Sequence, residues 1–200
     1  MKKGDLCEIS LLGTKKLVRF LGKGKYSRAY ADEDMPNKVY LRTHPKDLSK
    51  KLLVDCFNAK SPHIPRVEYL GTEDNKRSNC EFNWYQTEYS KSIEASCGEA
   101  WKQFKSLQKI NEEAKNEAGE EAQRDQRVLW ANKSFLNFSN RIQEMPREEI
   151  SDSLKEAIEL LVSTTICLCN NYVFEFRQPN LGVSADGTLQ LRDVVFCDDD

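Results

Sequence analysis

The chain has 200 residues and a mass of 23.1 kDa, which is enough for one ordinary domain or a small two-lobed core. No apolar stretch approaches the roughly 18 residues needed to cross a bilayer, so we expect no membrane partner. Seven cysteines without a CxxC pair exclude a zinc knuckle and a disulfide framework, and they indicate reduced thiols in the cytosol.

Charge is unevenly distributed along the chain. The net charge is −2, yet residues 1–66 carry 15 Lys and Arg against 7 Asp and Glu, a net of +8, and the remainder carries 15 against 25, a net of −10. A basic region of this kind is one signature of nucleic-acid binding. The cations are dispersed along the sequence without an aromatic platform for bases, so solvated faces explain them better and we expect no nucleic-acid partner.

A glycine-rich loop lies between two strand-like runs near the N-terminus. Residues 17–21 are mostly apolar, and residues 22–30 read GKGKYSRAY. Gly22 and Gly24 permit a tight strand–turn–strand in which backbone N–H groups can approach phosphates closely. An ordinary glycine hairpin has the same signature, so this loop gains meaning only together with a second motif.

The central segment from residue 98 to about residue 126 is predicted to be helical. Its apolar residues recur every three positions, as Trp101, Phe104, Leu107 and Ile110. This spacing makes a narrow stripe that usually packs on the domain. The stripe fades after Ile110, so residues 112–125 are expected to form a frayed or exposed helix, or a mobile loop. Trp101, Phe104 and Trp130 are candidate anchors for a protein partner, and core packing is the alternative.

A second amphipathic helix is predicted from about Glu149 to Asn170, after the boundary marked by Pro146. The apolar positions that define its face are Ile150, Leu154, Ile158, Leu161 and Thr165. Ser153 and Glu156 have the spacing of a capping box.

The C-terminal part contains a second polar motif. Glu175, Arg177 and Asn180 precede an apolar run, and an Asp-Gly turn at residues 186–187 separates it from a second apolar run that ends at Asp193. Asp-Gly between two apolar runs is a strong hairpin signal. In a phosphotransfer site of the kinase type, a loop acid positions the hydroxyl nucleophile, and an Asn five residues later and an Asp beyond a hairpin bind magnesium. A surface hairpin with scattered polar residues is the alternative.

With the glycine loop first and this motif last, the chain resembles the protein-kinase-like superfamily, and within it the compact early Ser/Thr protein kinases of lytic bacteriophages. The resemblance covers most of the chain. It implies a strand at residues 35–42, a hairpin that opens at residues 63–70, and a fifth strand with the hinge at residues 82–89, where the backbone near Glu88 would hold an adenine edge.

The resemblance implies an α+β class and a reduced two-lobed fold, with an antiparallel N-lobe sheet and a small, mainly helical C-lobe. Residues 1–89 would form the N-lobe, and residues 90–200 would form a truncated C-lobe. The C-lobe would contain a charged insert at residues 98–146 and the catalytic-loop-like hairpin at residues 172–195.

The resemblance also implies a role for each site residue. Glu175 and Arg177 would act in catalysis, and Arg42 would hold phosphates. The residues implied in binding the nucleotide are Gly22, Gly24, Ser27 and Glu88, and those implied in binding magnesium are Asn180 and Asp193.

Three of these positions depart from the family pattern. Arg42 stands where the family has the strand lysine, Glu175 where it has an aspartate, and Arg177 where many members have a lysine. A guanidinium does not replace a compact ammonium beside a phosphate. Because residues two apart in a strand share a face, Tyr40 would also crowd the pocket beside Arg42; a shift of one residue in register would instead turn Leu41 inward.

Two functions follow from this resemblance. The first is a degraded kinase-fold protein that binds and modulates a host protein of transcription or defence in the cytoplasm of a bacterial host. The second is an active protein Ser/Thr kinase that uses ATP and magnesium. The degenerate positions favour the first function.

Overall fold

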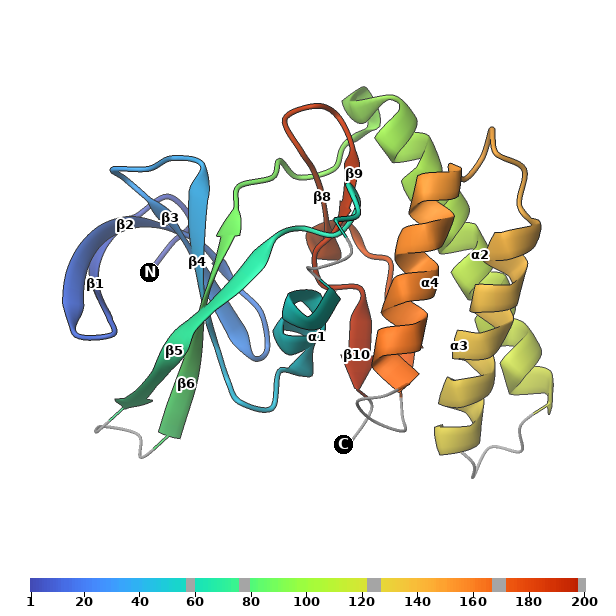
Figure 1. Ribbon diagram of the computed structural model, residues 1–200, viewed down its shortest axis with the longest axis horizontal. Coiled ribbons are helices and arrows are strands. Elements are labelled where there is room, and N and C mark those ends of the chain that lie inside the picture. Colours follow the sequence, from blue (N-terminus) through green and yellow to red (C-terminus); the bar gives the residue numbers. More distant parts are fainter. Residues whose placement is uncertain (57–59, 76–79, 122–126, 167–171, 198–200) are drawn as a thin grey trace. The chain divides into compact units, whose positions relative to one another are not determined.

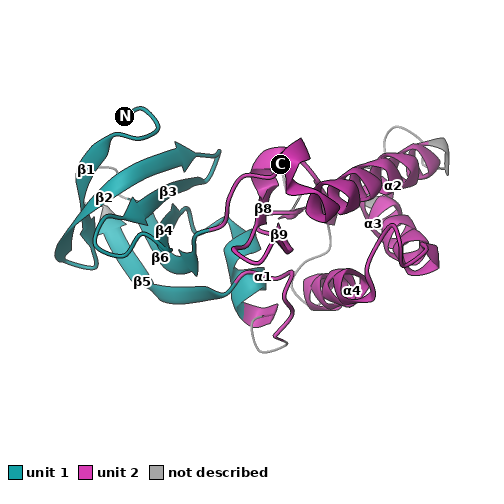
Figure 2. Cartoon of the chain, turned by 90° about the horizontal axis from the view of Figure 1, so that it is seen from above, with its two compact units in different colours: residues 1–54, 66–89 teal, residues 55–65, 90–200 magenta. Residues whose placement is uncertain are grey.

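The computed structural model describes residues 1–56, 60–75, 80–121, 127–166 and 172–197 (Figure 1). The chain divides into two compact units, one made of residues 1–54 and 66–89 and the other of residues 55–65 and 90–200 (Figure 2). The fold class is α+β, as the sequence predicts. The change of unit at residue 89 falls at the expected lobe boundary, whereas residues 55–65 group with the second unit.

The first unit is built on a curled antiparallel sheet whose six strands follow the order β1-β2-β3-β4-β6-β5 (Figure 1). Its strands are β1 (Leu6–Leu11), β2 (Thr14–Lys23), β3 (Ser27–Asp32), β4 (Lys38–Thr43), β5 (Val67–Asn75) and β6 (Cys80–Glu88). The predicted antiparallel N-terminal sheet is therefore confirmed. Helix α1 (Leu48–Cys56) follows β4 and buries Leu52, Leu53 and Cys56.

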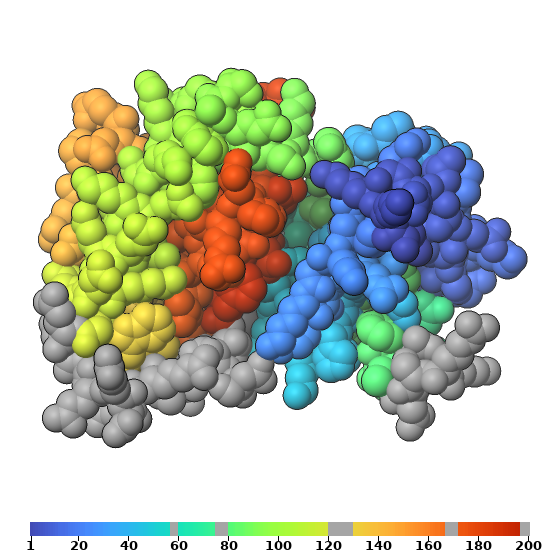
Figure 3. Space-filling view, turned by 180° about the vertical axis from the view of Figure 1, so that it is seen from behind, coloured from blue at the N-terminus to red at the C-terminus, as the bar shows by residue number. Residues whose placement is uncertain are grey.

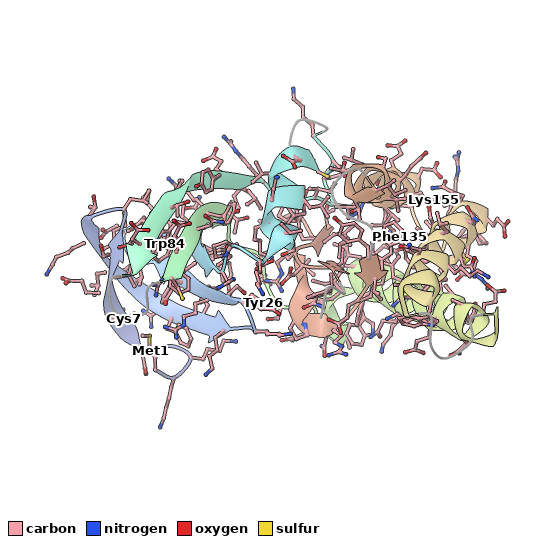
Figure 4. All side chains as sticks on the ribbon, turned by 90° about the horizontal axis from the view of Figure 1, so that it is seen from below. Met1, Cys7, Tyr26, Trp84, Phe135 and Lys155 are labelled. Carbon is pink, nitrogen blue, oxygen red and sulfur yellow. The ribbon has the colours of Figure 1, made fainter. Side chains whose placement is uncertain are left out.

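One face of this sheet carries a closed hydrophobic core. Strand pairing places Phe20, Tyr30 and Tyr40 opposite one another on neighbouring strands, and Trp84 lies on the same face of β6. These residues pack together with Leu11 of the first strand and Val18. Figure 4 labels Trp84 at this cluster. The N-terminal strand therefore helps to close this face of the curl.

The second unit contains helices α2 (Glu99–Glu121), α3 (Arg127–Glu144) and α4 (Asp152–Ile166), preceded by the short 3-10 helix η2 (Ala95–Cys97). Helix α2 continues to Glu121, so of the alternatives expected for residues 112–125 the structure shows a helix over residues 112–121, and residues 122–125 lie outside the described residues. Ala114 and Ala118 are fully buried and continue the apolar stripe with small side chains. Arg141 of α3 also holds α2 in place by ion pairs with Glu113 and Glu117 at 3.0 and 2.8 Å.

The predicted capping box of α4 is wrong. Ser151, not Ser153, caps the helix, because its hydroxyl accepts a hydrogen bond from the Leu154 N–H at 3.4 Å. Ser153 instead lies 3.0 Å from Nε2 of the buried His63. A hydroxyl that is used in a tertiary contact is not available as a cap.

Four short strands complete the second unit: β7 (Tyr172–Phe174), β8 (Leu181–Val183), β9 (Leu189–Leu191) and β10 (Val195–Cys197). Strands β8 and β9 form the predicted hairpin, whose turn contains Gly187 at φ 90°. Strands β7 and β10 form a second antiparallel pair. Across the described part of the chain, no helix is both long and apolar enough to span a membrane.

Candidate functional site

The two strand pairs of the second unit bring the C-terminal motif together. Residues 175–180 connect β7 to β8 and end in the 3-10 helix η3 (Gln178–Asn180), while Asp193 lies between β9 and β10. The carbonyl oxygen of Asn180 accepts hydrogen bonds from the N–H groups of Arg192 and Asp193 at 3.1 and 3.0 Å. The Glu175 N–H donates to the Val194 carbonyl at 2.8 Å. Residues that are far apart in sequence therefore form one compact polar site.

Side chains of the loop are linked as well. Arg177 lies 2.7 Å from the Glu175 carboxylate. The side-chain amide of Asn180 donates to the Glu175 carbonyl at 3.1 Å and to its carboxylate at 3.3 Å. The Glu175 side chain is 28% exposed, so an acid with two polar neighbours remains accessible to solvent.

An aromatic cluster supports this loop from within the second unit. Phe174 and Phe176, on either side of Glu175, are buried. The Phe174 ring stacks on Phe135 of α3 at 4.6 Å, and the Phe176 ring lies 5.0 Å from Phe138 (Figure 4). Since Phe174 and Phe176 point into the core, the alternation of an extended chain turns Glu175 the other way.

Helix α2 holds the loop backbone from a second side. The amide groups of Gln108 and Asn111 donate to the carbonyls of Phe176 and Phe174 at 3.0 and 3.1 Å. Lys115 follows on the same helical face, and burial lowers the pKa of its amine, while the nearby Glu175 carboxylate opposes part of that shift. Figure 3 shows the surface of the C-terminal hairpin, in red, beside that of α2, in green to yellow-green.

The sequence analysis did not identify Gln108 and Asn111 as site residues. Their spacing from each other and from Lys115 places them on one helical face, and this was the only signal that they act together. The segment predicted as a charged insert therefore packs against the candidate site.

Two oxygen donors of the site suit a magnesium ion bound together with a nucleotide. In the described ranges, no group of three or more His, Cys, Asp or Glu side chains could hold a metal ion by itself. Magnesium usually takes one or two protein carboxylates and completes its shell with water and phosphate oxygens. Asn180 Oδ1 and the Asp193 carboxylate are the groups that would serve, and the ion would neutralise phosphate charge.

One backbone N–H group of the glycine loop is hydrogen-bonded within the loop itself. The Gly24 N–H donates to the Ser27 carbonyl at 2.8 Å and closes the turn between β2 and β3. Gly22 lies at a register shift between these strands, and Ser27 pairs with Thr43 of β4. The N–H of Gly24 is therefore already engaged in a tight hairpin.

Arg42 and Tyr40 share a face of β4, as predicted, and this is the face that carries the packed core. Tyr40 is 2% exposed, and its hydroxyl donates to the buried Asp32 carboxylate at 2.7 Å. The Arg42 guanidinium carbon lies 3.9 Å from the centre of the Phe82 ring. Leu41 and Thr43 lie on the opposite face of the strand. The Arg42 guanidinium is thus stacked on an aromatic ring, and its expected role in holding phosphate stays a prediction.

Backbone groups at the end of β6 and just after it, where an adenine edge was expected to bind, are hydrogen-bonded within each unit. In the first unit the Tyr89 N–H, next to Glu88, donates to the Asn37 carbonyl at 2.7 Å. In the second unit Lys91 and Val183 exchange two backbone hydrogen bonds, each 2.9 Å long. Glu88 itself is exposed and borders a hollow of about 270 Å³ whose other lining residues are Asn37, Lys38, Arg66, Glu68, Gln86 and Thr87.

Arg192 fills the space beside Gly182 in the second unit. Its guanidinium donates to the carbonyl of Ser90 at 3.5 Å and to that of Leu181. A Cβ atom placed on Gly182 would lie 2.8 Å from Arg192 Nε, which is closer than real Cβ atoms come. The missing side chain at Gly182 therefore makes room for a guanidinium next to Asp193.

Of the candidate anchors in the central segment, Phe104 is 2% exposed and belongs to the core. Trp101 and Trp130 are partly buried; Trp130 donates to the Lys115 carbonyl at 3.2 Å.

No protein-family model matches the chain, and a search of curated proteins found no significant match.

Proposed function

We propose that this chain is a kinase-fold protein of the bacteriophage type that has lost efficient nucleotide binding and acts by binding a host protein of transcription or defence. The cytoplasm of a bacterial host is its proposed location. The observation that carries this proposal is the position of Arg42. The cation that should hold nucleotide phosphates is stacked on Phe82, on the sheet face that Tyr40 and the core cluster fill.

Four further contacts support the proposed loss of nucleotide binding. The N–H groups of Tyr89 and Lys91 are bonded to carbonyls of the chain, so these two donors are not available to an adenine edge. The Gly24 N–H is used inside its own turn. Arg192 covers Gly182 and reaches the carbonyl of Ser90, which immediately follows the predicted hinge. A nucleotide that used these groups would have to displace their internal bonds, and each displaced hydrogen bond would weaken its binding.

An active Ser/Thr kinase is the second candidate, and the C-terminal site favours it. Glu175, Asn180 and Asp193 lie together with Arg177 in the order and surroundings that phosphoryl transfer requires. In that case Glu175→Gln should abolish phosphate incorporation from labelled ATP, and Glu175→Asp should raise it by shortening the reach of the acid.

Expression in a bacterial host separates the two functions. The wild-type chain and the double variant Asn180→Ala/Asp193→Ala are expressed at matched levels, and host growth and co-purified host protein are measured. The proposal predicts that the double variant keeps both effects, because neither side chain is needed for binding. Loss of both effects in a double variant that still melts like the wild type would overturn the proposal and favour the kinase.

A further inference from the structure

Three cations form a row across neighbouring strands of the first unit. Lys23 of β2 lies directly opposite Arg28 of β3, and Arg28 lies directly opposite Arg42 of β4. Directly opposed residues of antiparallel strands project from the same face, with Cβ atoms about 5 Å apart. Lys23 and Arg28 are exposed, and Arg42 is half-buried. Cations that are dispersed in the sequence are thus gathered by the sheet.

Among the described residues, the three cations of this row have no carboxylate in an ion pair with them. Like charges that face each other across two strands destabilise a sheet. Elsewhere in the same unit, cations have carboxylate partners: Lys15 pairs with Glu8, Lys16 with Asp32 and Arg19 with Glu33. Within the described ranges, no ion pair joins Lys23, Arg28 or Arg42 to a carboxylate. Glu73, on the same face, is hydrogen-bonded to the Trp84 indole at 2.7 Å.

Arg42 is also held in a fixed orientation. Its guanidinium lies 3.9 Å from the Phe82 ring centre and 5.9 Å from that of Trp84. A guanidinium stacked on aromatic rings keeps its planar fork of N–H donors in place, and this fork suits a carboxylate or phosphate in a bidentate arrangement. The Arg42 Nε is buried and has no hydrogen-bond partner among the described residues. The row therefore ends in a guanidinium of fixed orientation.

We propose that the row formed by Lys23, Arg28 and Arg42 binds a carboxylate-rich segment of the partner protein. This inference depends on the proposed function, because it names the chemistry of the partner that such a protein would bind. The positive charge of the row is complementary to an acidic partner. Arg side chains supported by aromatic rings are also typical anchors of protein interfaces.

The number of cations in the row favours an acidic protein segment over nucleic acid as its ligand. Phosphate contacts supply most of the affinity for nucleic acid and commonly number about 6–10, whereas this row offers three cations. Single strands also need exposed rings on which bases stack. Here Trp84 is 2% exposed, and Arg42 covers a face of Phe82.

Fluorescence anisotropy with a labelled oligoglutamate peptide tests this site. The wild-type chain should bind the peptide, and binding should weaken as salt is raised. The double variant Arg28→Gln/Arg42→Gln should lose about tenfold or more in affinity, which corresponds to two surface charge contacts. Arg19→Gln, which removes a cation of β2 that already pairs with Glu33, should bind like the wild type.

Stability provides a second measurement. Arg28→Gln removes a like-charge contact on each side, so it should raise the melting temperature while weakening peptide binding. Unchanged peptide affinity in the double variant would overturn the proposal, as would tighter binding of a labelled oligothymidylate of matched charge. If the peptide test fails but the host-cell effect survives in Arg28→Gln/Arg42→Gln, the proposed function stands. Only the assignment of this row as the binding surface is then removed.

Discussion

Tyr40 connects a buried carboxylate to the core of the first unit. Asp32 is 2% exposed and accepts hydrogen bonds from the Tyr40 hydroxyl, from Lys16 and from the backbone N–H of Asp34. Burial alone would raise the pKa of Asp32, but these hydrogen bonds outweigh it and lower the pKa. The ring that seemed placed to crowd a nucleotide pocket therefore stabilises an ionised group instead.

Tyr40→Phe should test this assignment. The variant keeps the ring but removes the donor at 2.7 Å from Asp32, so the free energy of unfolding should fall by about 1.5–3 kcal/mol. Urea denaturation at neutral pH measures the change. Tyr89→Phe, at an exposed tyrosine, is the control and should stay within about 0.5 kcal/mol of the wild type. Equal effects of the two substitutions would contradict the buried hydrogen bond.

His63 ties the segment at residues 55–65 to the rest of the second unit. Its Nδ1 lies 2.9 Å from the Leu189 carbonyl, which can only accept, so Nδ1 carries the proton. Its carbonyl in turn accepts the Leu191 N–H at 2.8 Å. Burial lowers the pKa of His63, while the Leu189 hydrogen bond and the Asp186 charge oppose the shift. The folded state therefore favours the neutral ring.

This shift predicts a pH dependence of stability. The contribution of His63 is fully present above the pKa of an unfolded histidine, about 6.5, and is lost as the pH falls through the lower folded value, because the unfolded state then binds more protons. The difference in unfolding free energy between the wild type and His63→Gln should shrink from about pH 7.5 to about pH 5. Urea titrations across this range measure it, and a difference that does not change with pH would refute the assignment.

At the scale of elements, helix α2 is the part that fixes the candidate loop. Asn111 is 5% exposed, and its amide nitrogen donates to the Phe174 carbonyl. Asn111→Asp exchanges this donor for a charged acceptor of the same shape, so unfolding free energy should fall by about 3 kcal/mol or more. Asn116→Asp, on an exposed position of the same helix, should change it by about 0.5 kcal/mol or less. Similar losses in both variants would mean that α2 does not hold the loop.

The hairpin and the strands were predictable because local signals define them. Asp186 and Gly187 mark the β8–β9 turn, and the apolar runs on either side fix its strands. The packing of α2 beyond Ile110 was missed because Ala114 and Ala118 bury little apolar area and give a weak periodic signal, although they pack closely. A sequence pattern reports side-chain size more readily than close packing.

The position of Arg42 could not be settled from sequence for a different reason. Alternation fixes that Tyr40 and Arg42 share a face, but which face is closed depends on partners elsewhere in the chain. Here Leu11 and the rings of Phe20 and Tyr30 close it. The gathering of Lys23, Arg28 and Arg42 into a row has the same origin, because strand pairing alone makes dispersed cations adjacent.

At the scale of the whole molecule, the second unit assembles a polar site, and in the first unit groups that were expected to hold a nucleotide make internal contacts. The second unit keeps Glu175, Asn180 and Asp193 in contact with one another through the loop backbone. In the first unit, the Arg42 guanidinium is stacked on Phe82, and the Gly24 N–H is bonded inside its own turn. Loss of nucleotide affinity, with the fold retained, is what this combination predicts.

Calorimetric titration of magnesium-ATP into the full chain tests this claim most directly. The wild type should show no saturable binding tighter than about 1 mM, and its melting temperature should not rise with added ligand. The double variant Asn180→Ala/Asp193→Ala should behave in the same way. A dissociation constant in the micromolar range that is lost in the double variant would contradict the account and identify the chain as a working kinase.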